Sequence, residues 1–192
     1  MIKIIHRVNT IAYLKTIPVS FGVEVDIRAY TDQIILNHEP FQKGELFEDY
    51  LKQYAHAFIV LNIKEAGIEQ RVLDLVNKYK IKKYFLLDVE FPYIYTAARA
   101  KNRHIAIRYS EDEPIQAALQ YKDLLDWVWI DCNTRLPLNS AVIKKLAHFK
   151  TCLVSPDRWG RPEDIPLYRK KMAKLGFTPD AVMMAYEYES LW

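Results

Sequence analysis

The clearest structural signal in the chain is residues 57–90, AFIVLNIKEAGIEQRVLDLVNKYKIKKYFLLDVE. Its two ends, 57–64 and 83–90, are apolar and rich in β-branched and aromatic side chains, which is typical of buried strands. The segment between them has helical periodicity, with one apolar face formed by Ile68, Val72, Leu75, Val76 and Tyr79. The stretch therefore predicts a strand–helix–strand unit, from which parallel sheets are built.

The same alternation extends over the whole chain. Strand-like segments occur at 2–6, 22–30, 57–64, 83–90, 104–109, 127–132, 150–155 and 181–186. Helical patterns occupy 45–54, 67–80, 92–102, 114–125, 139–149 and 163–176, and 9–18 is short and weakly helical. One segment breaks the alternation, because TDQIILNHEP at 31–40 predicts a short returning strand directly after the second one. Strands that alternate with helices predict parallel pairing through right-handed crossovers.

The alternation predicts one α/β domain, residues 1–192, folded as a compact (β/α)₈ TIM barrel. About eight strands, nearly all apolar on both faces, favour a closed barrel over an open doubly wound sheet. An open sheet would want a glycine-rich phosphate loop after its first strand, where this chain has HRVNT. Because 192 residues are few for this fold, we expect minimal loops and an eighth helix that is short or absent.

Composition narrows the function classes. The formal net charge is +3, and the basic residues are scattered without the aromatic-interleaved stripe of a nucleic-acid-binding surface. No apolar run reaches the roughly 18 residues that a membrane span requires. The opening residues, MIKIIHRVNT, lack the apolar core of a signal peptide. We therefore expect a cytoplasmic protein without a membrane span or a nucleic-acid partner, and the sequence leaves its oligomeric state open.

Polar residues stand at the ends of nearly all predicted strands, where barrel enzymes carry their active sites. They are His6, Arg7, Glu24, Asp26, Arg28, His38, Asn62, Lys64, Asp88, Glu90, Arg108, Asp131 and Ser155. A polar group at almost every strand end is what a charged pocket requires. Within this pocket we expect Arg28, Arg108 and Asp131 to contact the substrate.

Glu24 and Asp26 form the most informative pair. Two residues apart on a strand, they point to the same side, so their carboxylates lie next to each other. Like charges at that spacing are costly unless a cation neutralises them. An oxygen-rich site of this kind suits Mg²⁺ or Ca²⁺. The alternative from the residues alone is an internal ion pair with Lys64 or Arg28.

Two histidines, His6 and His38, end the apolar segments on either side of the carboxylate strand. Two histidines across one pocket can divide general-base and general-acid duties near neutral pH. The remaining histidines, His56, His104 and His148, precede strands or end a helix. We expect those three at the opposite, structural end of the barrel, without a catalytic role.

The combination of His6-Arg7 with GVEVDIRAYTDQIILNHE at 22–39 resembles the glycerophosphodiester phosphodiesterase family of the phosphatidylinositol-phospholipase-C-like barrels. That family's pattern is HRG, then ExD, then a threonine-aspartate turn, then an apolar arm that ends in His-Asp. The matching residues are His6, Arg7, Glu24, Asp26, Thr31, Asp32 and His38. VLNIK at 60–64 also resembles the family's strand ending in Glu-x-Lys, with Lys64 as the lysine. The detailed match covers about the first third of the chain.

The chain departs from this pattern at three positions. Val8 replaces the glycine of HRG, and Glu39 replaces the aspartate of His-Asp. Asn62 stands where the family has a third metal-binding carboxylate. An amide oxygen can still ligate a hard cation, but the lost negative charge should weaken binding.

The resemblance implies metal-dependent hydrolysis of a small glycerophosphodiester-like substrate, a reaction of lipid metabolism. Glu24, Asp26 and Asn62 would hold one Mg²⁺ or Ca²⁺. His6 and His38 would serve as general acid and base, with Arg7 and Lys64 completing the electrostatic clamp on phosphorus. Two alternatives remain. Asn62 and Val8 favour a barrel that binds a phosphate- or sugar-containing ligand without turnover, and the fold also allows another metal-dependent enzyme, a sugar isomerase or lyase.

Overall fold

The computed structural model describes all 192 residues and divides them into two compact units. The N-terminal unit is Ile5–Tyr95, and the C-terminal unit combines Met1–Ile4 with Thr96–Trp192. The expectation that these residues form a single domain stays a prediction.

The sheet of the N-terminal unit is built around β2 (Gly22–Tyr30). β2 pairs in parallel with β5 (Phe58–Ile63), which pairs in parallel with β6 (Tyr84–Leu87). On its other edge β2 pairs antiparallel with β3 (Gln33–Leu36), the predicted returning strand, and β3 pairs with the short β4 (Glu45–Leu46). The β2–β5 register sets Asp26 opposite Asn62, which brings the predicted metal ligands of two strands together.

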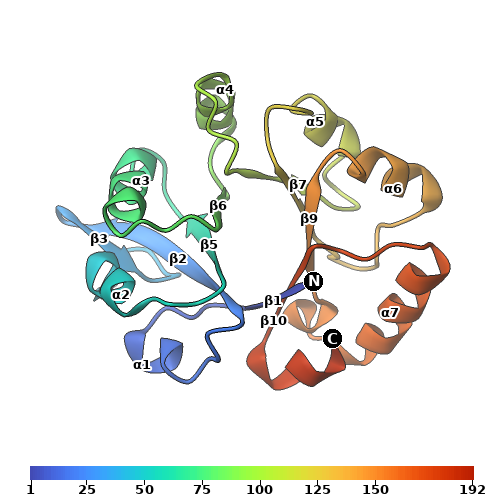
Figure 1. Cartoon of the computed structure of the whole chain (residues 1–192), viewed down its shortest axis with the longest axis horizontal. Helices are drawn as coiled ribbons and strands as arrows, with labels where there is room; N and C mark the ends of the chain where they lie inside the picture. Colours follow the sequence, from blue (N-terminus) through green and yellow to red (C-terminus); the bar gives the residue numbers. More distant parts are fainter. The chain divides into compact units, whose positions relative to one another are not determined.

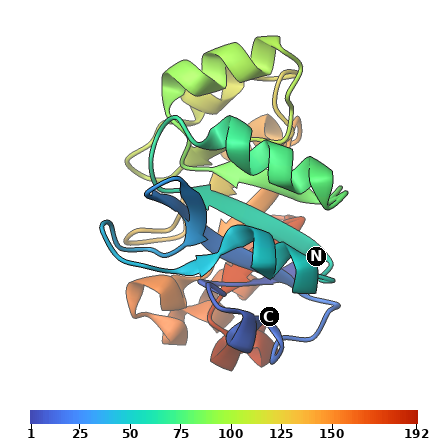
Figure 2. The ribbon, with the colours of Figure 1, turned by 90° about the vertical axis from the view of Figure 1, so that its left-hand side faces the viewer.

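Helices α2 (Phe47–Gln53) and α3 (Glu69–Lys78) lie beside the strands of this unit (Figures 1 and 2). α3 occupies the predicted helical stretch and buries Val72 and Val76 completely, as its apolar periodicity requires. Burial of a side chain of this size contributes about 1.5–3 kcal/mol. The first helix, α1 (Ile11–Leu14), has a single turn, and its N-cap Thr10 accepts a hydrogen bond from the Tyr13 N–H. α4 (Phe91–Arg99) begins in this unit and ends in the other.

In the C-terminal unit the strand order is β1-β10-β9-β8-β7. The bounds are β1 Ile2–Ile5, β7 Ala106–Tyr109, β8 Trp127–Ile130, β9 Lys150–Val154 and β10 Ala181–Met184. β7, β8, β9 and β10 are parallel to their neighbours. The helices between them are α5 (Ile115–Leu119), α6 (Ser140–Leu146) and α7 (Ile165–Lys174), drawn in yellow to red in Figure 1. The 3₁₀ turns η1 (Pro156–Trp159) and η2 (Pro162–Asp164) join β9 to α7.

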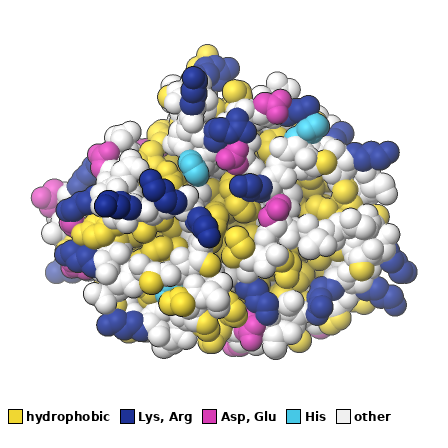
Figure 3. All heavy atoms as spheres, viewed as in Figure 1, with side chains coloured by type: hydrophobic (Ala, Val, Ile, Leu, Met, Phe, Trp, Pro, Cys, Tyr) yellow, Lys and Arg dark blue, Asp and Glu magenta, His cyan; other side chains and the backbone are white.

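All eight predicted strands are present, and several helices are shorter than their sequence patterns. α5 ends at Leu119, although the pattern runs to 125, and Asp123 within that range takes a positive φ of 65° that ends any helix. After β10 the chain forms only the 3₁₀ turn η3 (Tyr186–Leu191), in agreement with the short or absent eighth helix. None of the helices combines the length and apolar character needed to cross a bilayer. On the face shown in Figure 3, basic side chains alternate with acidic and apolar ones.

Candidate functional site

The two predicted carboxylates, Glu24 and Asp26, lie on β2 and are both only 1% exposed. Buried carboxylates need hydrogen bonds or counter-charges, and both have them. The groups that surround them come from the loop after β1, from β5 and from the end of β6. These groups are Arg7, Asn9, Asn62, Lys64 and Asp88, and we call them, with Glu24 and Asp26, the carboxyl-end cluster.

Glu24 is held by two neutral donors. The Arg7 backbone N–H donates to its Oε2 at 2.7 Å, and Asn62 Nδ2 donates to its Oε1 at 2.8 Å. Arg7 takes a positive φ of 53°, and this turn points its N–H at the carboxylate. Burial, and then the negative charge of Asp26, raise the pKa of Glu24 to about 7, against the lowering effect of the two hydrogen bonds and Lys64. Near neutral pH this carboxyl is therefore poised between its charged and neutral forms.

Asp26 is fixed from both sides by Asn9. The Asn9 Nδ2 donates to Asp26 Oδ2, and the Asp26 N–H donates to Asn9 Oδ1, each at 2.8 Å. The Lys64 Nζ lies 3.2 Å from Asp26 Oδ1 and 3.6 Å from Asp88 Oδ2. The Arg7 Nε is 3.8 Å from Asp26 Oδ2. The internal ion pair considered for Lys64 is thus present, beside the carboxylate pair.

Arg28 has a mainly architectural set of contacts. Its Nε donates to the His38 carbonyl at 3.1 Å and its Nη1 donates to the Lys64 carbonyl at 3.1 Å. The same guanidinium lies 3.7 Å from a carboxylate oxygen of Glu65. Arg28 therefore ties the His38 loop to the end of β5, and its expected contact with substrate stays a prediction.

Two oxygen atoms of the cluster fit a metal ion. Asp26 Oδ1 and Asn62 Oδ1 are both buried and accept no hydrogen bond. Buried acceptors normally have a hydrogen-bond partner. Two buried acceptors without one, on the neighbouring strands β2 and β5, therefore suit a cation. Carboxylate and amide oxygens are the ligands that Mg²⁺ and Ca²⁺ prefer. The donor set of Glu24, Asp26 and Asn62 therefore fits the expected divalent ion, in competition with the Lys64 ammonium.

The two predicted histidines have different surroundings. The His6 Nε2 lies 4.0 Å from Glu24 Oε2, and its side chain is 18% exposed. The His38 Nδ1 lies 2.5 Å from Glu39 Oε1, and its side chain is 34% exposed. The hydrogen bond with His38 lowers the pKa of the exposed Glu39 carboxyl. Glu39, which departs from the family's aspartate, thus still reaches the histidine beside it.

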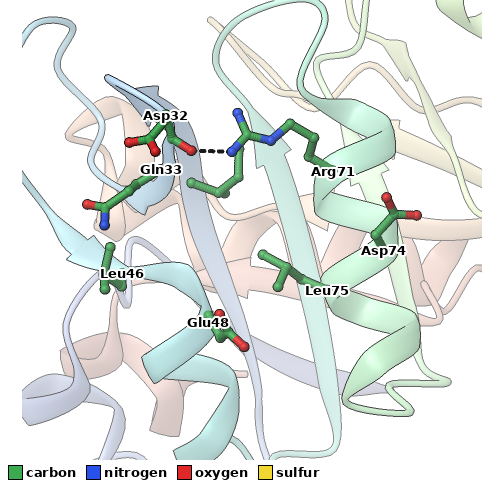
Figure 4. Close-up of a pocket in the computed structure, with 8 residues that line it drawn as sticks. Asp32, Gln33, Leu46, Glu48, Arg71, Asp74 and Leu75 are labelled. Carbon is green, nitrogen blue, oxygen red and sulfur yellow. Dashed lines mark hydrogen bonds between the residues drawn. The ribbon is translucent and has the colours of Figure 1, made fainter.

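The Thr31-Asp32 turn has a structural contact and borders a groove outside the carboxyl-end cluster. The Asp32 carbonyl accepts a hydrogen bond from the Arg71 guanidinium of α3, drawn as a dashed line in Figure 4. The groove measures about 350 Å³, and its wall includes Leu46, Glu48 and Asp74 (Figure 4). The turn therefore anchors the β2–β3 hairpin to α3.

Arg108 and Asp131, the other two expected substrate-binding residues, are partners in the C-terminal unit. The Arg108 Nη1 donates to Asp131 Oδ2 at 2.9 Å. The other Asp131 oxygen accepts from the Trp159 Nε1 at 2.8 Å and from the Cys132 N–H at 3.0 Å. Arg161 donates to the Cys132 carbonyl and pairs with Asp164, which fixes the turns after β9. A substrate-binding role for Arg108 and Asp131 stays a prediction.

Sequence patterns missed Asn9 and gave Asp88 no role in the site. Asn9 follows the His-Arg pair in an irregular loop, where no periodicity indicates the direction of a side chain. Asp88 directly follows β6 and takes a positive φ of 60°, a conformation that the sequence pattern does not predict. The only sequence signal for Asn9 and Asp88 is that each follows an apolar strand.

Comparison with known proteins bears on the fold. No family model matches the sequence, and no curated protein matches it. Among solved structures, a glycerophosphoryl diester phosphodiesterase from Parabacteroides distasonis superposes with a TM-score of 0.67 at 12% identity, over 99% of this chain and 85% of that one. A candidate glycerophosphoryl diester phosphodiesterase from Agrobacterium tumefaciens gives a TM-score of 0.66 at 12% identity, over 95% and 93% of the two chains.

This chain has the glycerophosphodiester phosphodiesterase fold. The likeness extends over nearly the full length of the chain, so it includes the two thirds in which no sequence motif was recognised. It confirms the predicted (β/α)₈ barrel class and the resemblance drawn from His6, Glu24, Asp26 and His38 at the level of fold. At 12% identity the likeness shows the fold and not the activity.

Proposed function

We propose that the chain is a metal-dependent phosphoric diester hydrolase that acts on a glycerophosphodiester-like substrate. The observation that carries the proposal is the carboxyl-end cluster. It sets two buried carboxylates and two unsatisfied oxygens beside the Lys64 ammonium and two histidine-bearing loops. The phosphodiesterase-like fold supports the same chemistry.

Glu24, Asp26 and Asn62 would hold one Mg²⁺ or Ca²⁺. When bound, such an ion stabilises negative charge on a phosphoryl oxygen. The remaining positive charge comes from this chain. Lys64 is 17% exposed and can reach a phosphate while it stays near Asp26. Arg7, whose side chain is 37% exposed, can contribute a second cationic group.

His38 is the better general base. If the Nδ1–H donates to Glu39, the Nε2 of the neutral ring carries a lone pair. That nitrogen would take the proton of the substrate hydroxyl next to the phosphate. As the hydroxyl oxygen bonds to phosphorus, the bond to the leaving alkoxide breaks. Glu39 then stabilises the imidazolium that forms, as a carboxylate does in other His-carboxylate pairs.

His6 is the better general acid. The His6 Nε2 lies 4.0 Å from Glu24 Oε2, beside the carboxylates that would hold the metal ion. A protonated His6 would give its proton to the leaving alkoxide. Water then opens the cyclic phosphate with the two roles reversed, which returns both histidines to their first state.

The proposal is tested by hydrolysis of a glycerophosphodiester with and without EDTA. We expect turnover that EDTA abolishes and that Mg²⁺ or Ca²⁺ restores. A matched substrate whose neighbouring hydroxyl is replaced by hydrogen should not react, because the attacking group is missing. Turnover that survives EDTA, or equal rates on both substrates, contradicts this mechanism.

A second candidate, ligand binding without turnover, is favoured by one specific contact. The Lys64 Nζ lies 3.2 Å from Asp26 Oδ1, the oxygen that a metal would use, and Asn62 supplies no negative charge. A site already neutralised by its own lysine could bind a phosphate ester and leave it intact. Glycerophosphodiesters that raise the melting temperature but are not hydrolysed with any divalent ion would establish this reading.

A further inference from the structure

A second charged hollow lies at the amino ends of β5 and β6. It is at the opposite end of β5 from Asn62 and Lys64. Its volume is about 430 Å³, the size of a small-molecule pocket. The polar side chains in its wall are Tyr54, His56, Lys80, Lys82 and Lys83, and no acidic side chain lines it. We call it the amino-end pocket.

The three lysines of this pocket have no counter-charge. Lys80, Lys82 and Lys83 are exposed and make no side-chain hydrogen bond or ion pair. Two lysines on the neighbouring helices are paired instead, Lys52 with Asp49 at 2.7 Å and Lys78 with Glu48 at 2.5 Å. Three unpaired ammonium groups around one hollow repel each other, and a bound anion relieves that repulsion.

The lysines need an anion, whereas His56 needs a hydrogen-bond donor. Its ring is only 9% exposed, and its Nε2 lies 2.9 Å from the Ile17 carbonyl. A carbonyl can only accept, so Nε2 carries the hydrogen and Nδ1 of the neutral ring is an acceptor. That Nδ1 is buried and has no hydrogen-bond partner. His56 thus lines the pocket, and one of its ring nitrogens has no hydrogen-bond partner.

Tyr54 supplies an uncharged hydroxyl. Burial raises the pKa of its phenol, so the group stays neutral over the physiological range. Its ring lies beside His56, with the ring centroids 5.7 Å apart. A neutral hydroxyl can either donate to a phosphate oxygen or accept from a ligand hydroxyl.

We propose that the amino-end pocket binds a soluble phosphorylated polyol, whose phosphate contacts the three lysines and whose hydroxyl donates to His56 Nδ1. A carboxylate or sulfate satisfies the lysines but brings no donor for Nδ1. A phosphate monoester carries between one and two negative charges at neutral pH, and its polyol supplies hydroxyl groups. The proposal stands apart from the proposed hydrolase function, because no residue of the carboxyl-end cluster takes part.

The ordinary explanation of these lysines is the end of α3. Its C-cap is Tyr79, and basic side chains near a helix C-terminus interact favourably with the last carbonyls. That explanation accounts for Lys80. It does not account for a hollow of this size or for the unpartnered nitrogen of His56 on the other wall.

The test is calorimetric titration of the full chain with glycerol 3-phosphate at pH 7, with sodium sulfate as a second probe. We expect glycerol 3-phosphate to bind several-fold tighter than sulfate. The double variant Lys82→Ala/Lys83→Ala should weaken glycerol 3-phosphate binding about tenfold. The matched control Lys144→Ala/Lys145→Ala removes two adjacent lysines from α6, and we expect unchanged affinity.

Two further variants separate this pocket from the other end of the strands and test the histidine. Lys64→Ala disables the phosphate clamp of the carboxyl-end cluster and should leave the measured binding intact. His56→Phe keeps a ring, removes the nitrogen acceptor and should abolish the preference over sulfate while sulfate binding itself is unchanged. The proposal is wrong if glycerol 3-phosphate binding is lost with Lys64→Ala or survives Lys82→Ala/Lys83→Ala. It is also wrong if the protein binds phosphatidate vesicles, in which the phosphate belongs to a lipid, but not soluble glycerol 3-phosphate.

Discussion

The two ends of β5 and β6 differ in whether their lysines have acidic partners. At the carboxyl ends, Lys64 sits 3.2 Å from Asp26 and 3.6 Å from Asp88, so its charge is balanced within the protein. At the amino ends, Lys82 and Lys83 face the hollow without any acidic neighbour in its wall. The carboxyl end has two unsatisfied acceptors, Asp26 Oδ1 and Asn62 Oδ1, and no acidic side chain lines the hollow at the amino end.

The difference in charge pairing determines what each end can bind. Buried carboxylates with spare oxygens favour a metal ion, whereas unpaired ammonium groups favour a phosphate. In (β/α)₈ enzymes the carboxyl ends of the strands carry catalysis and the amino ends carry stability. The amino-end pocket departs from that rule.

The largest effect should come from the histidines at the carboxyl end. His6→Ala and His38→Ala should each lower turnover of a glycerophosphodiester by on the order of 10²–10⁴-fold, because each removes one proton-transfer group. Both side chains are partly exposed, so the melting temperature should change little. His148→Ala, at an exposed position after α6, is the control. Near-normal turnover in either test variant would refute the two-histidine mechanism.

The next largest effect concerns Glu24 and pH. Its pKa is raised from 4.5 to about 7 on folding, so the folded state holds this proton more tightly than the unfolded state. The stabilising contribution is complete below pH 4.5 and is lost as pH rises through 7. Glu24→Gln keeps the neutral form at every pH. Its advantage in free energy of unfolding over the wild type should therefore grow by on the order of 2–3 kcal/mol between pH 5 and 8.

Denaturant titrations at the two pH values measure this difference in the absence of divalent ions. Glu163→Gln, at an exposed position in η2, is the matched control and should show no such growth. An advantage of Glu24→Gln that is constant with pH would show that the Glu24 carboxyl is not held neutral by burial.

How much of this contrast could be predicted from sequence depends on the kind of information. The sequence predicts that the β2 carboxylates share one face because strand periodicity is strict, whereas the β2–β5 register that sets Asp26 opposite Asn62 is known only from the structure. Asn9 lies outside any periodic element, so its two hydrogen bonds with Asp26 could not be predicted from the sequence pattern. The sequence shows only scattered basic residues and predicts a structural role for His56. Only three-dimensional placement brings the unpartnered His56 nitrogen and the lysines to one hollow.

A smaller effect is expected at Asn62. Asn62→Glu restores a third carboxylate beside Glu24 and should tighten Mg²⁺ or Ca²⁺ binding by on the order of tenfold, because affinity at such sites rises with ligand charge. Without metal the same variant should melt at a lower temperature, since a further buried carboxylate adds repulsion. Calorimetric metal titration and thermal melts measure both effects. Asn77→Glu, on the exposed side of α3, is the control, and unchanged metal affinity in Asn62→Glu would show that this position does not face the ion.

The smallest effect tests the amino end. Lys80 follows α3 with a positive φ of 57°, a conformation in which a side chain is strained and glycine is not. Lys80→Gly should therefore raise the free energy of unfolding by about 0.5–1 kcal/mol, because the relief of strain exceeds the added freedom of the unfolded chain. It should at the same time weaken glycerol 3-phosphate binding, because one of three ammonium groups is gone. Tyr79→Gly, one residue earlier at φ −90°, lacks the strain and should destabilise instead. If Lys80 lowers stability and raises affinity, its role is to bind the ligand. If Lys80→Gly is more stable and binds glycerol 3-phosphate equally well, Lys80 only follows the end of α3 and has no part in binding.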